Sequence, residues 1–232
     1  MMTGAPAPYC MANDNIIQLL LILNLVGIAY ALLMNGMGIL ERTKCIFYYE
    51  NKSTPYNDRT HITRICNTLL DFQFIFYATI VATAVVDEHC FDITSRNSLQ
   101  VTGTLAAMFT AFLLIKRAMH TIVNNILYTK GINEEWNSFY FFATKLWGFT
   151  LAPAALAILF LPGIPLKYVE FYSILTLALH LYAIIKGAYK IIFAKKCIYV
   201  DIFLYLCALE FLPIAIVWKT ILQLGDFITI KI

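Results

Sequence analysis

The sequence is poor in charge and contains none of the short motifs that mark common catalytic sites. Asp, Glu, Lys and Arg make up 13% of the 232 residues, about half the share of a typical soluble domain. H-E-x-x-H, G-x-S-x-G, the Walker loop and G-x-G-x-x-G are all absent. These absences favour a protein that is not an enzyme.

Metal and nucleic-acid sites also lack support in the sequence. The six cysteines include no C-x-x-C pair, and the four histidines show no ligand spacing. We therefore expect neither a metal ion nor a cofactor. The 17 Lys and Arg residues form no compact basic domain, so we expect no nucleic-acid partner.

Long apolar blocks dominate the chain instead. Hydrophobic residues make up 60% of the sequence, and a membrane-spanning helix needs about 20 mostly apolar residues. Each block is expected to be a helix, because a lone helix satisfies its own backbone groups in lipid. The blocks are Ile16–Leu40, Leu69–Val86, Leu99–Ile115, Ser138–Leu161, Tyr168–Ile185 and Tyr199–Ile221. The sequence therefore predicts an all-α polytopic membrane protein with six transmembrane helices in one domain, residues 16–224.

The distribution of Lys and Arg predicts the orientation of these helices. The five intervals between blocks carry five, one, three, one and four basic residues in chain order. Basic loops remain on the inner side of a membrane. We therefore expect both termini outside, with residues 1–15 and 225–232 as short terminal segments and the lipid bilayer as the main partner.

Two basic stretches follow the third and fifth blocks with helical spacing of apolar residues. We expect 116–130 and 186–196 to be short amphipathic helices on the inner membrane surface. Their cations would face anionic headgroups, and ordinary anchoring is favoured over specific lipid recognition. The expected inner-surface residues are Lys116, Arg117, Lys186, Lys190, Lys195 and Lys196.

Three ionisable residues fall inside the predicted spans. At about 1.5 Å of rise per residue, Glu210, His180 and Lys145 lie at broadly similar depths on three helices. A Lys145–Glu210 bridge would hold the fourth and sixth helices together. Alternatively, Glu210 is protonated and exchanges protons with His180 in a ligand or proton site. Contact of this polar cluster with a partner subunit is the third interpretation.

Two prolines lie within predicted spans. Proline cannot donate a backbone hydrogen bond and clashes with the carbonyl four residues earlier. Pro153 and Pro213 are therefore expected to kink their helices. The carbonyl freed by Pro213 lies next to Glu210 in the sequence.

Two segments carry a family resemblance. FLYLCALEFLP, residues 203–213, and GINEEWNSFYFFATKLWGFTLAP, residues 131–153, resemble an uncharacterised family of small multi-pass inner-membrane proteins of Bacteroidota, a domain of unknown function. The resemblance spans roughly Thr60 to Lys219, and the first fifty residues show no clear match. The Y-L-C-x-L-E-x-L-P core of the family maps onto Tyr205, Leu206, Cys207, Leu209, Glu210, Leu212 and Pro213. It implies bacterial origin and the importance of Glu210, and it brings no activity with it.

These observations lead to two functional hypotheses for a multi-pass protein of the bacterial cytoplasmic membrane. The first is an accessory or scaffold subunit of an envelope or membrane-biogenesis complex, with other membrane subunits as partners. The alternative is a small transporter or proton-coupled carrier that uses Glu210, His180 and Lys145. A carrier needs a water-accessible cavity that reaches Glu210 from one side, whereas a scaffold should hold Glu210 in a closed contact.

Overall fold

The structure, a computed structural model, describes residues 14–47, 61–89, 98–127, 130–161, 164–193, 210, 212–217 and 219–220. This part of the chain is helical and contains no strand. Its elements are α1 (Asn15–Phe47), α2 (His61–His89), α3 (Ser98–Leu127), α4 (Lys130–Phe160), α5 (Leu166–Ala188) and the π-helical turn η2 (Tyr189–Phe193). The all-α prediction is therefore confirmed for the described residues.

Five of these helices are long and apolar enough to cross a membrane. They correspond to the first five predicted blocks, and each extends beyond its block into more polar sequence. Most of the sixth block lies outside the described residues, although 212–217 within it is helical. The structure thus supports a multi-pass membrane protein.

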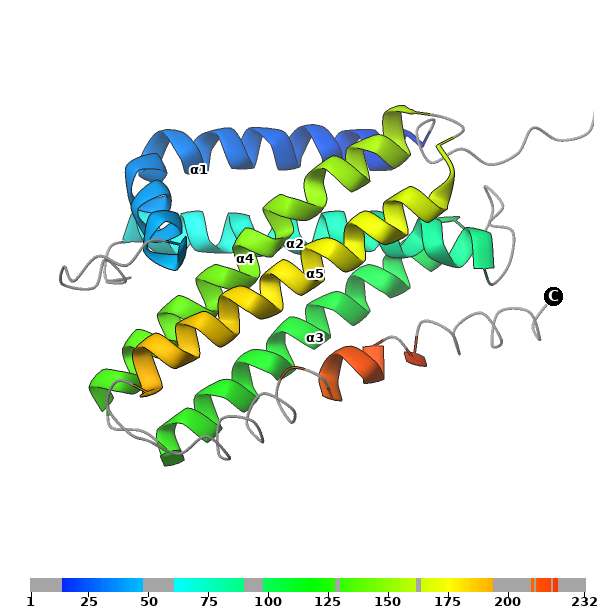
Figure 1. Cartoon of the computed structure of the whole chain (residues 1–232). Coiled ribbons are helices and arrows are strands. Elements are labelled where there is room, and N and C mark those ends of the chain that lie inside the picture. The colour runs from blue at the N-terminus through cyan, green and yellow to red at the C-terminus, as the bar shows by residue number, and fades with distance from the viewer. Residues whose placement is uncertain are drawn as a thin grey trace, which may run out of the picture.

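Successive helices run in opposite directions, as the short connections between most of them require (Figure 1). The helix α2 lies at the centre and packs against α1, α3 and α4, while α5 packs mainly on α4. The described part of the C-terminal segment lies beside α3 (Figure 1). The elements that carry Glu210 and its neighbours are therefore the C-terminal segment, α3 and α4.

The helices α1 and α2 form a regular antiparallel seam. The Cys66 thiol lies 3.9 Å from the backbone oxygen of Ala31. A Cβ atom at Gly27 would lie 3.3 Å from the Leu69 side chain. Glycine therefore allows close packing at this point, and the two contacts fix the register of the seam.

A kink interrupts α1 at Asn35, where the backbone adopts φ −142° and ψ 24°. The last turns of α1 then pack on α4, where the guanidinium of Arg42 lies 5.9 Å from the centroid of the Phe142 ring. The sequence instead predicted kinks at the two prolines. Pro153 lies inside the continuous helix α4, and Pro213 lies in the short helical stretch 212–217.

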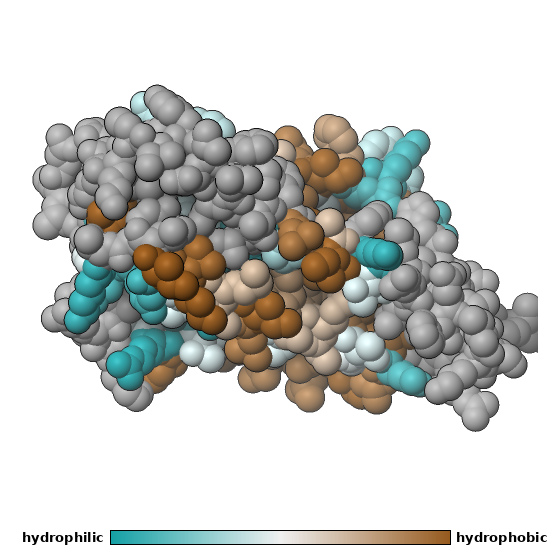
Figure 2. Space-filling model, turned by 90° about the horizontal axis from the view of Figure 1, so that it is seen from below, coloured by the Kyte–Doolittle hydropathy of each residue, from teal (hydrophilic) through white to brown (hydrophobic). Residues whose placement is uncertain are grey.

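The outer surface carries a broad apolar zone. Figure 2 shows hydrophobic side chains over the middle of the molecule, with hydrophilic ones nearer its two ends. On α1, Leu33 and Met37 are 86% and 75% exposed, and on α5 Phe171 is 69% exposed. Apolar exposure of this extent is typical of a surface that contacts a membrane or another protein.

The two predicted surface helices look different in the structure. Residues 116–127 belong to the uninterrupted helix α3 rather than to a separate helix. After the fifth span, α5 continues directly into η2, and residues 194–196 lie outside the described residues. Neither stretch therefore forms a separate interfacial helix within the part of the chain that the structure describes.

Candidate intramembrane polar site

The C-terminal half of α3 presents a polar face to the protein interior. Lys116, His120 and Asn124 recur every four residues, so they lie on one face of the helix. They are at most 3% exposed, whereas Ile122 and Ile126 on other faces are 59% and 77% exposed. Polar groups inside and apolar groups outside suit a helix that faces lipid rather than water.

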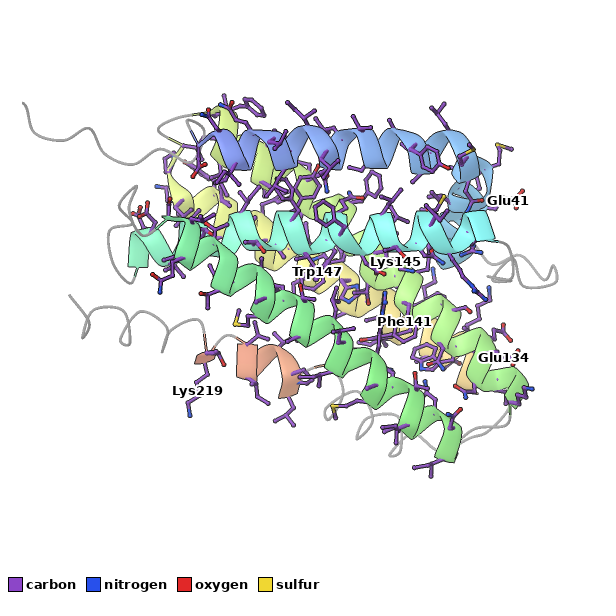
Figure 3. All side chains as sticks on the ribbon, turned by 180° about the vertical axis from the view of Figure 1, so that it is seen from behind. Glu41, Glu134, Phe141, Lys145, Trp147 and Lys219 are labelled. Carbon is purple, nitrogen blue, oxygen red and sulfur yellow. The ribbon has the colours of Figure 1, made fainter. Side chains whose placement is uncertain are left out.

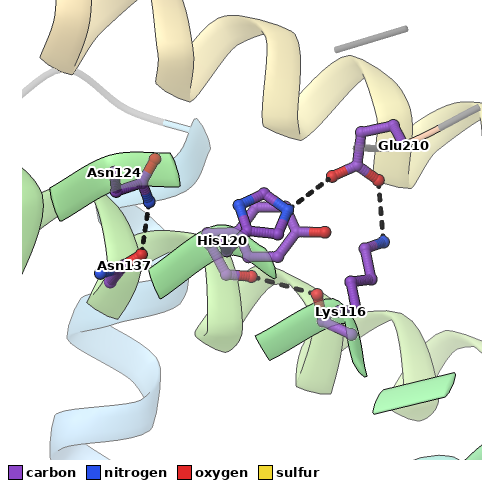
Figure 4. A network of polar contacts seen from close by, with 7 residues as sticks. Lys116, His120, Asn124, Asn137 and Glu210 are labelled. Atoms are coloured by element: carbon purple, nitrogen blue, oxygen red, sulfur yellow. Dashed lines mark hydrogen bonds and ion pairs between the residues drawn. The ribbon is translucent and has the colours of Figure 1, made fainter. Parts of the chain in front are cut away.

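Glu210 closes this polar face. Its Oε2 lies 2.8 Å from Nζ of Lys116, and both side chains are at most 3% exposed. Its Oε1 lies 3.6 Å from Nε2 of His120 (Figure 4). We call these three residues the Lys116–His120–Glu210 cluster. A buried carboxylate is tolerated when it is paired and hydrogen-bonded in this way.

Aromatic rings from α3 and α4 pack against the two basic side chains of the cluster. The His120 ring stacks on Tyr140 with centroids 3.7 Å apart and an interplanar angle of 27°. The Lys116 ammonium lies 5.3 Å from the Tyr140 ring and 5.4 Å from the Phe112 ring. These distances permit cation–π attraction, which is stronger where water is excluded. Tyr140 therefore supports both basic partners of Glu210.

Four asparagines continue the polar seam between α3 and α4. Asn124 donates to Asn137 over 2.6 Å, and Asn137 donates to Asn133 over 2.6 Å. Asn133 in turn donates to Asn125. Such side-chain hydrogen bonds join helices within membranes, so the seam fixes the α3–α4 hairpin beside the cluster.

A second ion pair joins α2 and α3 and involves Arg117, the residue that follows Lys116 on α3. Arg117 pairs with Asp71, and their side chains are 38% and 19% exposed. The Arg117 guanidinium also lies 5.4 Å from the centroid of the Phe141 ring. This pair is therefore much more accessible than Lys116–Glu210.

A small pocket separates the two ion pairs. It has room for about one water molecule and is partly open to the molecular surface. The pocket thus lies between the partly exposed Asp71–Arg117 pair and the Lys116 side chain. Its lining residues are Asp71, Leu113, Lys116, Arg117, Tyr140, Phe141 and Thr144.

The structure assigns Glu210 a different ammonium partner from the one expected. Lys116 lies within hydrogen-bonding distance of its carboxylate, whereas the sequence had suggested Lys145. Lys145 is buried on α4 at 6% exposure. His180 is buried on α5 and stacks on Trp147 with centroids 4.9 Å apart.

The sequence interpretation missed Lys116 and His120 because it ended the third span at Ile115. Lys116 was consequently expected at the inner surface, but it is 3% exposed. The four-residue spacing of Lys116, His120 and Asn124 was the available signal. It indicates a buried polar face when the same helix stays within the membrane.

The other expected surface cations have varied environments. Arg117 is partly exposed in its pair with Asp71. Lys186 is exposed and Lys190 is partly exposed. Lys195 and Lys196, which were also expected at the inner surface, lie outside the described residues.

No group of three or more His, Cys, Asp or Glu side chains is arranged for a metal ion among the described residues.

Comparison with known proteins finds a family model that matches the chain. No curated protein and no solved structure is significantly similar to the chain.

The matching family model is described as a domain of unknown function and covers residues 17–221. The match includes most of α1, so the family extends into the first fifty residues, where the resemblance showed no clear match. It also includes α3, α4 and Glu210, which together build the polar site. Because the match covers most of its length, the chain belongs to the family of the domain of unknown function DUF4271.

Proposed function

We propose that this chain is a non-enzymatic accessory or scaffold subunit of a complex in the bacterial cytoplasmic membrane. The observation that carries the proposal is the closed contact between Lys116 and Glu210. Both side chains are almost fully buried, and the two residues are 94 positions apart in the chain. The Glu210 carboxylate is thus paired with a cation of the same chain, as expected of a residue that stabilises the packing of helices.

A buried ion pair of this kind favours a defined arrangement more than it adds stability. Two apolar residues of similar size often give equal or greater stability, whereas a pair restricts which segments can pack together. Here the pair fixes the C-terminal segment to α3. We infer that it holds the helices in the one arrangement that a partner subunit recognises.

The outward surface supplies room for such a partner. The span of α1 is the least buried of the five, although the helix packs well on α2. Leu33 is 86% exposed on α1. In a membrane, this surface contacts lipid or the helices of other subunits.

The test combines purification with site-specific crosslinking in the native host. A photoreactive amino acid at Leu33 should crosslink to the same protein that co-purifies with the tagged chain in mild detergent. The matched control carries the photoreactive group at Ile184, which is fully buried, and should give no such product.

The accessory role also predicts how the ion pair affects the partner. The Glu210→Gln variant should weaken the Leu33 crosslink, and the double variant Lys116→Met/Glu210→Met should restore it. Absence of any reproducible crosslink or co-purifying subunit from the wild-type chain would contradict the proposal.

A further inference from the structure

We infer that the span of α1 moves away from α2 when a partner subunit binds, and that a polar side chain of the partner's transmembrane helix then hydrogen-bonds Asn24 and Gln73. This inference rests on the proposed accessory role, and it names the place where the partner binds and the chemistry that the partner offers. Two buried amides, a hinge and a lightly packed helix support it.

Asn24 on α1 and Gln73 on α2 are polar residues that the closed seam leaves without partners. Both are almost fully buried, and none of their four amide oxygen and nitrogen atoms has a hydrogen-bond partner among the described residues. Burial of such an amide costs free energy. Unsatisfied buried groups are rare in folded proteins and call for a functional explanation. The two amides therefore point to a group that binds them in another state of the protein.

The register of the seam brings the two amides within reach of one ligand. Gly27 packs against Leu69 where α1 and α2 are closest. Asn24 precedes Gly27 by three residues and Gln73 follows Leu69 by four, so in antiparallel helices both lie about one turn beyond this contact on the same side. An amide has two donor hydrogens and an acceptor oxygen. A single amide or hydroxyl group placed between the helices can thus bond to both residues.

The remainder of the seam offers little resistance to separation inside a membrane. Ile17 and Leu21 of α1 are buried in the apolar core. Lipid tails are as apolar as these side chains, so no hydrophobic force holds the helices together in a bilayer. The span of α1 is also the least buried of the five. The exchange of α2 for lipid or for another helix on this face therefore has a small cost.

A hinge separates the span of α1 from an anchored end. The backbone leaves the helical conformation at Asn35, and nothing lies within 4 Å of a Cβ atom at Gly36. Beyond this point the last turns of α1, which carry Glu41, turn away from the direction of the span (Figures 1 and 3). These turns are held on α4, because Arg42 is buried over the Phe142 ring. A few residues at the end of an element can absorb the dihedral changes of a hinge, so the span can move while its end stays in place.

The movement is compatible with the closed ion pair that supports the accessory role. Lys116 lies on α3 and Glu210 in the C-terminal segment, and neither belongs to the α1–α2 seam. The part of the protein that contains the ion pair thus stays fixed while α1 opens.

The chemistry of the seam selects the occupant. Lipid tails have no hydrogen-bonding group and leave the amides unsatisfied. A transmembrane helix with an Asn, Gln, Ser or Thr side chain satisfies them, since such side chains join helices within membranes. Because this helix binds only the open seam, its binding shifts the protein toward that state.

Photocrosslinking from inside the seam tests the inference on the full chain in the native host. A small diazirine amino acid at Leu21, which is buried between the helices and leaves both amides intact, should capture the same protein as the photoreactive group at Leu33. The matched control carries the diazirine at Ile184, which is also buried but packs with residues of α4. This control should capture no partner.

A pair of double variants tests the role of the amides. Asn24→Leu/Gln73→Leu removes both polar groups and favours the closed seam. We expect it to lower the partner crosslinks from Leu21 and Leu33 about tenfold, which corresponds to ~1.4 kcal/mol of binding free energy. The matched control Asn24→Gln/Gln73→Asn exchanges the two amides and keeps their total size, so its crosslinks should stay near the wild-type yield.

Two results would overturn the inference. One is a partner crosslink from Leu33 with none from Leu21, which would leave the accessory role intact without opening of the seam. The other is a wild-type crosslink yield in Asn24→Leu/Gln73→Leu. If the diazirine at Leu21 prevents folding, the yields from Leu33 in the two double variants decide alone. Absence of a partner crosslink from either position would instead contradict the accessory role itself.

Discussion

Gly148 of α4 lies directly against the backbone of Phe74 on α2. A Cβ atom at Gly148 would come within 2.8 Å of the Phe74 Cα and 3.2 Å of its backbone nitrogen. The backbone of a central helix cannot move aside as the end of a flexible side chain can. Glycine at this position therefore sets the distance between the two most extensively packed helices.

Replacement of this glycine should separate α2 from α4. We expect Gly148→Ala to lower the free energy of unfolding by about 1–3 kcal/mol, the usual cost of overpacking a core. Denaturation in mixed detergent micelles measures the change.

Gly103→Ala is the matched control for this prediction, because nothing lies within 4 Å of a Cβ atom at Gly103. Alanine there should leave stability unchanged or raise it slightly, since it favours a helix over glycine by up to about 1 kcal/mol. Equal effects of the two variants would show that the α2–α4 distance is not set by Gly148.

Loss of one partner from the buried ion pair should be more damaging than loss of both. Glu210→Gln leaves the Lys116 ammonium buried without its carboxylate. We expect a loss of about 3–5 kcal/mol, the range for a buried pair broken on one side. The double variant Lys116→Met/Glu210→Met should recover most of this loss.

The same denaturation measurements check that prediction, with each variant compared in one lipid and detergent mixture. A double variant as unstable as Glu210→Gln would mean that Glu210 stabilises the fold through contacts other than Lys116. His120 would then be the first candidate, because its Nε2 lies 3.6 Å from Oε1 of Glu210.

The α1–α2 seam contains a second polar pair that can be tested. Asn24 and Gln73 each lie one turn beyond the Gly27–Leu69 contact, so the antiparallel register places them opposite each other. Both are at most 2% exposed, and neither amide has a hydrogen-bond partner among the described residues. A buried amide without a hydrogen-bond partner costs free energy, because its donor and acceptor atoms have lost their bonds to water.

Asn24→Leu and Gln73→Leu should therefore each leave the free energy of unfolding unchanged or raise it by up to about 1–3 kcal/mol, because each removes a buried amide that has no partner. Denaturation of each variant in one lipid and detergent mixture measures the change. A clear loss of stability in either variant would show that its amide forms a hydrogen bond in the folded protein.

Fusion reporters test the predicted orientation. Alkaline phosphatase is active only outside the cytoplasm, so fusions at either terminus should be active if the chain crosses the membrane six times. A fusion between α1 and α2, within residues 48–60, should be inactive because five basic residues lie between the first two apolar blocks. An inactive fusion at the C-terminus would show that the last segment does not cross.

The positions of the helices could be predicted from the sequence, but the contacts between them could not. Hydropathy located α1 to α5 because the apolar blocks and the charge alternation are both local properties of the chain. The partner of Glu210 depends on which helix lies beside the C-terminal segment, and no local pattern specifies this. Both Lys145 and Lys116 could have paired with Glu210 as far as the sequence shows. The packing of α3 beside the C-terminal segment brings Lys116 into contact with Glu210.

The kink in α1 also could not be predicted from the local sequence. Proline is the usual cause of a sharp kink, yet the non-helical residue of α1 is Asn35. The kink lets Arg42 reach Phe142 on α4, a contact between residues far apart in the sequence. A tertiary contact of this kind overrides the local preference for a straight helix.

The separation of Lys116 and Glu210 along the chain has a consequence for biosynthesis. Ribosomes add roughly 5–20 residues per second, so Glu210 is made about 5–20 s after Lys116. During this interval α3 enters the membrane with a lysine that has yet to meet its carboxylate. A chain truncated before Glu210 would therefore retain the Lys116 ammonium without its carboxylate, at the cost expected of an unpaired buried charge.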